Sequence, residues 1–456
     1  MFDARDMTEG SPVSNLIQFS IPLLVGNLAQ QLYNTVDSIV VGQYVGDNAL
    51  AAVGASGPLL NLLLVLFMGV ATGAGIMVSQ YFGAKDRENL SLTVGNTLTL
   101  TLIAGLLMTI LGVALTRPFM TMLSTPPDIL DMSCDYLIII FAGMVGCAFY
   151  NIVSGILRGL GDSMMPLFFL LLACGLNIVL DLLFVATFHM GVAGVAWATI
   201  IAQAISAIFC VLRLIRMRHV LTINGHTLRL HGDLVWRLIK LGLPAGLSQA
   251  IFSMAAIVVQ SLTNSFGTAV IAANTMVMRV DGFVMMPNFT FGTAMTTFAG
   301  QNIGAGKLDR VHRGTKDGVI MALIVSSTLC ACILLFGQYL MALFTDTPEV
   351  ITLGVRMMRI LAAGYIAMGL SQTLLGVMRG AGDTMTPMWA SVLTTVVIRL
   401  PLAYLLAYLT RSEAQPTGSP DSLYISLLVS WLLGAAFSFA CYKWGKWSKR
   451  AVVQAK

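Results

Sequence analysis

Charged residues are scarce in this chain of 456 residues: only 10% are Asp, Glu, Lys or Arg, against roughly a quarter in ordinary soluble domains. Hydrophobic residues make up 57% of the chain, and the mean hydropathy is +0.83. So few charges cannot cover the surface of a soluble protein of this size. The composition therefore excludes a soluble enzyme, a disordered chain and a secreted disulfide scaffold. It predicts an all-α membrane protein.

Histidine and cysteine are also few, with five and seven residues. The cysteines lie mostly within apolar runs and lack the spacing of metal ligands, which favours a packing role. The sequence contains no acidic metal-binding cluster and no nucleophile beside a base, so we expect neither an enzyme nor a bound cofactor. The net charge of +5 comes from basic residues scattered between apolar runs. It does not indicate binding to nucleic acid, and we expect the lipid bilayer as the main partner.

Twelve apolar runs are long enough to cross a bilayer as helices. They cover residues 14–40, 51–79, 92–115, 132–157, 166–187, 193–216, 240–262, 270–299, 314–337, 353–377, 387–409 and 422–444. With the N-terminus in the cytoplasm, the inner connections and tails hold 20 Lys and Arg residues and the outer connections hold two. This asymmetry predicts that both termini are cytoplasmic.

One eleven-residue segment occurs twice, 221 residues apart. Residues 157–167 and 378–388 are identical at six positions and share the pattern Arg-Gly-x-Gly-Asp-[Ser/Thr]-Met-x-Pro. The segments 80–84 and 301–305 share the same offset and the pattern Gln-x-x-Gly-Ala. The glycines of the longer element suit a tight turn, its Asp can cap the next helix, and its Pro suits that helix's first turn.

These repeats predict two homologous lobes of six helices each. We expect an N-terminal lobe at 1–216, a cytoplasmic linker at 217–239 and a C-terminal lobe at 240–456. Because six is even, the two lobes are parallel and pseudo-symmetric, with a central cleft between them. This architecture is typical of transport by alternating access.

Ionisable side chains inside a membrane are costly, so each one is a functional candidate. Asp37 and Asp181 lie in apolar runs of the first lobe. Asn34 and Asn177 precede them by three and four residues, which places each pair on one helix face. Carboxylates and amides gathered in this way could bind Na⁺ through oxygen ligands or hold a proton. The second lobe has apolar residues at the corresponding positions, so we expect ion coupling in the first lobe.

The second lobe carries its own intramembrane charges, Arg279 and Asp281 in the run 270–299 and Arg399 in the run 387–409. Arg279 and Asp281 are two residues apart and do not face each other on a helix. Asp281 could pair with another helix or form a second cation site.

The many methionine and aromatic side chains suggest a substrate cleft that accepts compounds of varied structure. The chain has 27 Met and 22 Phe, and flexible thioethers and aromatic faces suit varied flat cations. The residues expected to line the cleft are Gln30, Tyr33 and Asn34 in the first lobe, and Met276, Arg279, Asp281 and Met285 in the second.

The doubled Arg-Gly-x-Gly-Asp-[Ser/Thr]-x-x-Pro element, the segment Val36-Asp37-Ser38 and the Gln-x-x-Gly-Ala elements resemble the multidrug and toxic compound extrusion (MATE) family. The resemblance extends over nearly the whole chain and is closest to the DinF-type bacterial branch. It implies twelve helices in two lobes, and we expect a monomer in the bacterial cytoplasmic membrane. It also implies export of mostly cationic, amphiphilic drugs in exchange for H⁺ or Na⁺, and hence a role in antibiotic resistance.

In that branch, the resemblance implies a coupling site made by Asp37, Asn177, Asp181 and Thr199, with Asn151 as a further candidate. The same oxygen ligands would hold Na⁺ if the exchange used sodium. Another bacterial branch adds acidic residues in its seventh and tenth helices, but the runs 240–262 and 353–377 contain no Asp or Glu.

An alternative on the same scaffold is a flippase for a lipid-linked intermediate. A flippase of this superfamily usually has extra helices or a strongly cationic central cavity. Only Arg279 and Arg399 could supply that charge here. The sequence does not identify the natural substrate, and it does not distinguish H⁺ from Na⁺, because the same carboxylates serve both.

Overall fold

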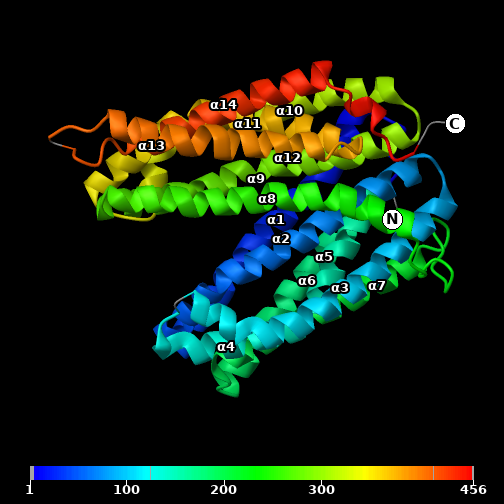
Figure 1. The fold of residues 1–456 in the computed structure, drawn as a ribbon, viewed down its shortest axis with the longest axis horizontal. Coiled ribbons are helices and arrows are strands. Elements are labelled where there is room, and N and C mark those ends of the chain that lie inside the picture. The colour runs from blue at the N-terminus through cyan, green and yellow to red at the C-terminus, as the bar shows by residue number, and fades with distance from the viewer. Residues whose placement is uncertain (1–4, 124, 414, 454–456) are drawn as a thin grey trace. The chain divides into compact units, whose positions relative to one another are not determined.

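A computed structural model describes residues 5–123, 125–413 and 415–453, apart from the side chains of Asp47, Pro58, Leu62, Leu63 and Leu66 (Figure 1). Within this part the chain is helical and contains no strand. The helical elements are α1 (Pro12–Val40), η1 (Val41–Val45), α2 (Asp47–Gly83), α3 (Arg87–Met122), α4 (Pro127–Ala142), α5 (Met144–Gly159), α6 (Met164–Asp181), η2 (Leu182–Thr187), α7 (Gly191–Arg216), α8 (Gly232–Ser265), α9 (Thr268–Gly304), α10 (Leu308–Ala342), α11 (Pro348–Gly380), α12 (Met385–Ser391), η3 (Val392–Arg399), α13 (Leu400–Leu409), α14 (Asp421–Trp444) and η4 (Trp447–Lys449).

Each of the twelve predicted spans coincides with one helix or with consecutive helical segments. Among the described residues, nine helices are long and apolar enough to cross a membrane, or ten if the bent pair α4 and α5 counts as one span. The bend of 54° between α4 and α5 lies at Gly143. Helices α1 and α2, with 29 and 37 residues, also exceed the length that a bilayer requires. The predicted class, an all-α multi-pass membrane protein, is confirmed.

The chain divides into two compact units whose bounds differ from the predicted lobes. Of the described residues, unit 1 contains residues 5–6 and Ile21–Gly246, and unit 2 contains Met7–Ser20 and the residues from Leu247 onward. The predicted linker and the beginning of α8 thus belong to unit 1, and the beginning of α1 belongs to unit 2.

Hydrogen bonds explain these bounds. In the linker, the backbone N–H of His231 donates to the side-chain oxygen of Asn96 in α3 at 2.6 Å. Near the start of the chain, the guanidinium of Arg310 donates to the carbonyl oxygens of Glu9 at 2.8 Å and Gly10 at 2.7 Å. The linker before α8 therefore hydrogen-bonds to unit 1, and the residues before α1 hydrogen-bond to unit 2.

Each unit is built around one central helix. In unit 1, α5 packs on α2, α3 and α7, and in unit 2, α11 packs on α9, α10 and α14 (Figure 1). A Cβ atom added to Gly155 of α5 would lie 2.8 Å from the carbonyl oxygen of Ala71. A Cβ atom added to Gly376, its counterpart in α11, would lie 2.3 Å from the carbonyl oxygen of Gly292. The sequence repeat is thus also a repeat of close helix packing.

The Arg-Gly-x-Gly-Asp element forms the same turn in both units. Gly161 and Gly382 have φ angles of +82° and +90°, which favour glycine. The carboxylate of Asp162 accepts a hydrogen bond from the backbone N–H of Met165 at 3.0 Å, and Asp383 caps α12 in the same way at 3.2 Å. The predicted structural role of this element as a turn and helix cap is confirmed.

Candidate functional site

Unit 1 brings Asp37 of α1 and Asp181 of α6 together. Their carboxyl groups lie close enough to hydrogen-bond to each other. Asp37 is half-buried and Asp181 is fully buried. One oxygen of each carboxyl, Oδ1, is buried without a hydrogen-bond partner in the described part of the chain. The two carboxyls therefore have capacity for a further ligand.

Both helices change geometry next to these acids. Helix α1 continues into the π-helical segment η1, which starts at Val41, and α6 continues into the π-helical segment η2 directly after Asp181. Short π-helical turns inside α-helices are frequent at functional sites. The backbone thus supports a functional interpretation of both positions.

The amide of Asn177 links Asp181 to Thr199. Its nitrogen, Nδ2, donates to Oδ2 of Asp181 at 2.9 Å, and its oxygen accepts from the backbone N–H of Thr199 at 3.3 Å. These two bonds satisfy both ends of the amide and hold it against the carboxylate of Asp181.

Two tyrosines complete this cluster. Tyr33 lies one turn before Asp37 in α1, and its hydroxyl group lies close to the side chain of Thr199. Tyr136 of α4 is 6% exposed and lies close enough to both carboxyls to interact electrostatically. From the sequence, Tyr33 is expected only as a cleft residue, and Tyr136 carries no signal of a functional role.

The other polar residues predicted in the first lobe bond elsewhere. The amide of Asn151 donates to the carbonyl oxygen of Cys147, in its own helix, at 2.8 Å. Gln30 donates to the side-chain oxygen of Asn34 at 3.3 Å, and Asn34 is exposed. Positions three apart on a helix differ by roughly 60° in direction, and this offset separates Asn34 from the side of α1 that contributes to the carboxyl cluster.

The carboxyl cluster is rich in oxygen. Its side chains are two carboxyls, one amide and three hydroxyl groups, without sulfur or imidazole. Oxygen ligands suit hard cations such as Na⁺, and repulsion between two nearby carboxylates is also relieved by one shared proton. Among the described residues, no group of three or more His, Cys, Asp or Glu side chains could hold a metal ion. A bound Na⁺ would therefore need neutral oxygens beside the two carboxylates.

Unit 2 encloses a different arrangement around Asp281. The hydroxyl of Tyr365 in α11 donates to Oδ1 of Asp281 in α9. Arg399, at the end of η3, lies close enough to Asp281 to interact electrostatically, whereas Arg279 is exposed. Asp281 therefore has a hydrogen-bonding partner on a neighbouring helix, which was one of the two predicted roles.

The predicted cleft methionines of unit 2 lie in a different environment. Met285 is 8% exposed and belongs to the hydrophobic core of unit 2, and Met276 packs against that core. Their thioethers face the apolar interior of their own unit because α9 packs there against α11. This placement supports a packing role for both side chains.

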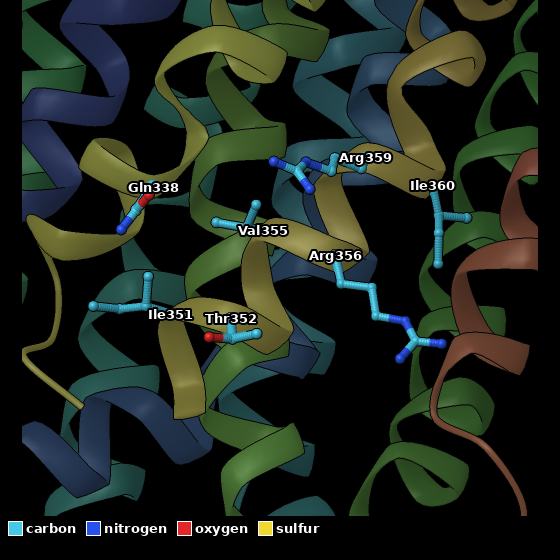
Figure 2. A pocket seen from close by; sticks show the side chains of 7 residues that line it. All are labelled: Gln338, Ile351, Thr352, Val355, Arg356, Arg359 and Ile360. Carbon is cyan, nitrogen blue, oxygen red and sulfur yellow. The ribbon is translucent and has the colours of Figure 1, made fainter. Parts of the chain in front are cut away.

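A larger cavity in unit 2 contains none of the predicted site residues. It has a volume of about 610 Å³ and lies between α10 and α11, lined by Gln338, Ile351, Thr352, Val355, Arg356, Arg359 and Ile360 (Figure 2). Arg356 also forms an ion pair with Asp421. We therefore assign the candidate site to the carboxyl cluster of unit 1.

The fold and the site define a multi-pass membrane protein of two repeated helical units, with ionisable side chains buried inside them. A family model described as MatE matches residues 22–183 and 244–405, and the chain belongs to this family. The two matched segments begin at Pro22 and Pro244. They lie one in each repeat, which confirms the duplication.

Named relatives match along almost the whole chain. The "Probable multidrug resistance protein YoeA" of Bacillus subtilis is 30% identical over 420 residues, which cover 90% of this chain and 91% of the relative. The "Probable multidrug resistance protein NorM" of Thermotoga maritima is 24% identical over 96% of this chain and 94% of the relative. A solved structure described as an "outward-facing conformation of a multidrug resistance MATE family transporter" has a TM-score of 0.88 at 24% identity, covering 96% of this chain and 97% of that one. At that identity, the structural match establishes the fold.

Proposed function

We propose that the protein is a secondary antiporter that exports amphiphilic, mostly cationic compounds across the bacterial cytoplasmic membrane in exchange for H⁺ or Na⁺. The carboxyl pair Asp37 and Asp181 carries this proposal, because buried acids with unpaired oxygens can bind and release a cation. Family membership and the names of relatives such as YoeA support the drug-like substrate class. The excess of basic residues in the predicted inner connections supports cytoplasmic termini.

The exchange begins with the ionised pair. While Asp181 is ionised, Nδ2 of Asn177 donates to it. A proton that binds to Asp181, or a Na⁺ ion held by the two carboxyls, weakens the donation from Asn177 to this carboxylate. Because the same amide also contacts Thr199, occupation of the pair changes the contacts of Thr199.

Thr199 connects this change to α1. Its hydroxyl group lies close to that of Tyr33, one turn before Asp37 on that helix. Helix α1 begins among residues grouped with unit 2 and continues, from Ile21, in unit 1. Occupation of the carboxyl pair therefore acts on a helix whose two parts belong to different units. This connection supports alternating access as the transport mechanism.

The proposal predicts efflux driven by an ion gradient. The purified protein is reconstituted in vesicles with a fluorescent organic cation, and a pH gradient and a Na⁺ gradient are imposed separately. We expect at least one gradient to drive the dye against its concentration difference, and we expect this movement to stop when an ionophore collapses the gradient. Empty vesicles serve as the control. If neither gradient moves the dye above this control, the proposed antiport is wrong.

A further inference from the structure

A second, small cavity in unit 2 lies beside Arg399. It has a volume of about 40 Å³ and is lined by residues of α8, α11, α12, η3 and α14. Gln372, Thr395 and Trp431 line it together with Arg399, and none of its lining residues is acidic. A single water needs roughly 10–15 Å³ of such space, so the cavity has room for one small ion or one small chemical group.

Arg399 places a positive charge beside the cavity, and no carboxylate of the described residues contacts its guanidinium. Its Nε is buried without a hydrogen-bond partner, and its guanidinium forms no ion pair with any described residue. Asp281 is close enough to act electrostatically, but it accepts its hydrogen bond from Tyr365. Arginine cannot escape the cost of burial by losing its proton. Because Asp281 does not contact the guanidinium, an anion in the cavity would add direct, charge-assisted hydrogen bonds to Arg399.

Three other polar side chains at the cavity offer hydrogen-bond donors, whereas the hydroxyl groups of the remaining four already hydrogen-bond within the protein: Ser371, Ser391, Thr394 and Ser430. Gln372 is 7% exposed and Thr395 is 3% exposed, and neither side chain hydrogen-bonds to another described residue. Trp431, whose ring centroid lies 5.9 Å from that of Tyr365, contributes an indole N–H that can only donate. Guanidinium, amide, hydroxyl and indole donors, around a cavity without carboxylates, match an anion.

We propose that this cavity is a binding site for one small monovalent anion, either chloride or the carboxylate group of a transported molecule. Arg399 provides the charge-assisted hydrogen bonds, and Gln372, Thr395 and Trp431 provide neutral donors. The site lies in the helical span that corresponds, in the repeat, to the span of Asn177 and Asp181 in unit 1. The equivalent spans of the two units then bind ions of opposite sign. Cation exchange in unit 1 does not require this anion, so the inference goes beyond the proposed antiport.

Thermal unfolding of the full chain in lipid nanodiscs tests the site. The midpoint of unfolding is measured in sodium chloride, sodium acetate and sodium isethionate at equal concentrations, with isethionate as a larger anion that carries no carboxylate. We expect chloride, acetate or both to raise the midpoint in a saturable manner relative to isethionate. A response to chloride alone identifies the inorganic ion, and a response to acetate alone identifies the carboxylate of a transported molecule. No response to either anion would overturn the proposal.

Variants connect the response to the cavity. Arg399→Gln is expected to abolish the saturable shift, and Gln372→Leu to raise the half-saturating anion concentration by about tenfold, the effect of one lost hydrogen bond to a charged group. The matched control is Arg411→Gln, because the Arg411 guanidinium lies over the ring of Tyr408, 5.3 Å from its centroid, and does not line the cavity. A shift that persists unchanged in Arg399→Gln overturns the site.

Fluorescence provides a test that does not depend on the folding of the Arg399 variant. Bromide can occupy a chloride or carboxylate site and quenches an indole that it touches. We expect bromide to quench the wild-type protein with a saturable component, and we expect Trp431→Phe to lose that component. If quenching of the wild type increases only linearly with bromide, or if the saturable component survives in Trp431→Phe, the anion does not bind beside Trp431 and the proposal fails.

Discussion

Replacing Asp37 with asparagine is expected to reduce gradient-driven efflux to the level of empty vesicles while the protein still folds. Asparagine has nearly the same size and can still hydrogen-bond, but it carries no negative charge and releases no proton. The change also removes repulsion with Asp181, so we expect no fall in the unfolding midpoint. The measurement is dye efflux under whichever gradient drives the wild type, together with thermal unfolding of the same preparation.

The matched control is Asp135→Asn. Asp135 is an exposed acid of α4 in the same unit, directly before Tyr136, and this variant is expected to retain transport. Binding of the fluorescent cation, measured by its polarisation, separates coupling from substrate recognition, and we expect Asp37→Asn to retain it. Efflux at the wild-type rate in Asp37→Asn would rule out Asp37 as a coupling residue. Loss of efflux in both variants would show that the assay responds to any lost acid in this unit.

The duplicated fold could be predicted because its signals are local and strong. Apolar runs of about 20 residues are long enough to span a bilayer and are longer than the apolar runs of soluble proteins. The Gly-Asp turn is also recognisable, because a short segment supplies both a glycine for a positive φ angle and an aspartate for a helix cap. Asp37 and Asp181 stood out for a related reason, since a charge inside an apolar run needs an explanation. Their proximity in unit 1 agrees with the expectation that they form one polar pocket.

Other parts of the site lack such a signal. Tyr136 is uncharged and lies in an apolar run, and its position depends on the packing of α4 in unit 1. The π-helical segments beside Asp37 and Asp181 have no distinctive composition. They form where tertiary packing favours a wider helical turn that contains one more residue than an α-helical turn. The grouping of Met7–Ser20 with unit 2 depends on contacts such as those of Arg310, about 300 residues later in the chain.

The cavity of unit 2 illustrates the same limit. Arg399 is visible in the sequence as an intramembrane charge, but Gln372 and Thr395 are neutral polar residues of a kind found in many membrane helices. Only the packing of η3 against α14, and of α11 against α14, brings these donors to one cavity. An intramembrane charge such as Arg399 is thus visible in the sequence, whereas the side chains that surround it are known only from the three-dimensional packing.

The second large effect is expected from Gly155→Leu, which should prevent normal packing of unit 1. Gly155 and Gly159 form a Gly-x-x-x-Gly pattern on α5, a pattern that permits close contact between membrane helices. Added Cβ atoms would lie 2.8 Å from the carbonyl oxygen of Ala71 and 2.7 Å from that of Gly75. These are backbone atoms of α2, so the contact is relieved only if the helices separate. We expect a loss of about 3 kcal/mol or more in the free energy of unfolding.

Helix propensity alone would stabilise the variant, because leucine favours a helix over glycine by roughly 0.8 kcal/mol. A loss of stability in Gly155→Leu must therefore come from the close helix packing. Gly175→Leu, in α6 of the same unit, provides the control, since no atom lies within 4 Å of an added Cβ there. We expect Gly175→Leu to unfold at the wild-type temperature or slightly above it, and Gly155→Leu to give little monodisperse protein after detergent extraction. Size-exclusion chromatography and thermal unfolding measure both effects. Equal unfolding midpoints for Gly155→Leu and the wild type would show that α2 and α5 do not pack this closely, and would remove the structural basis for the repeated helix crossing.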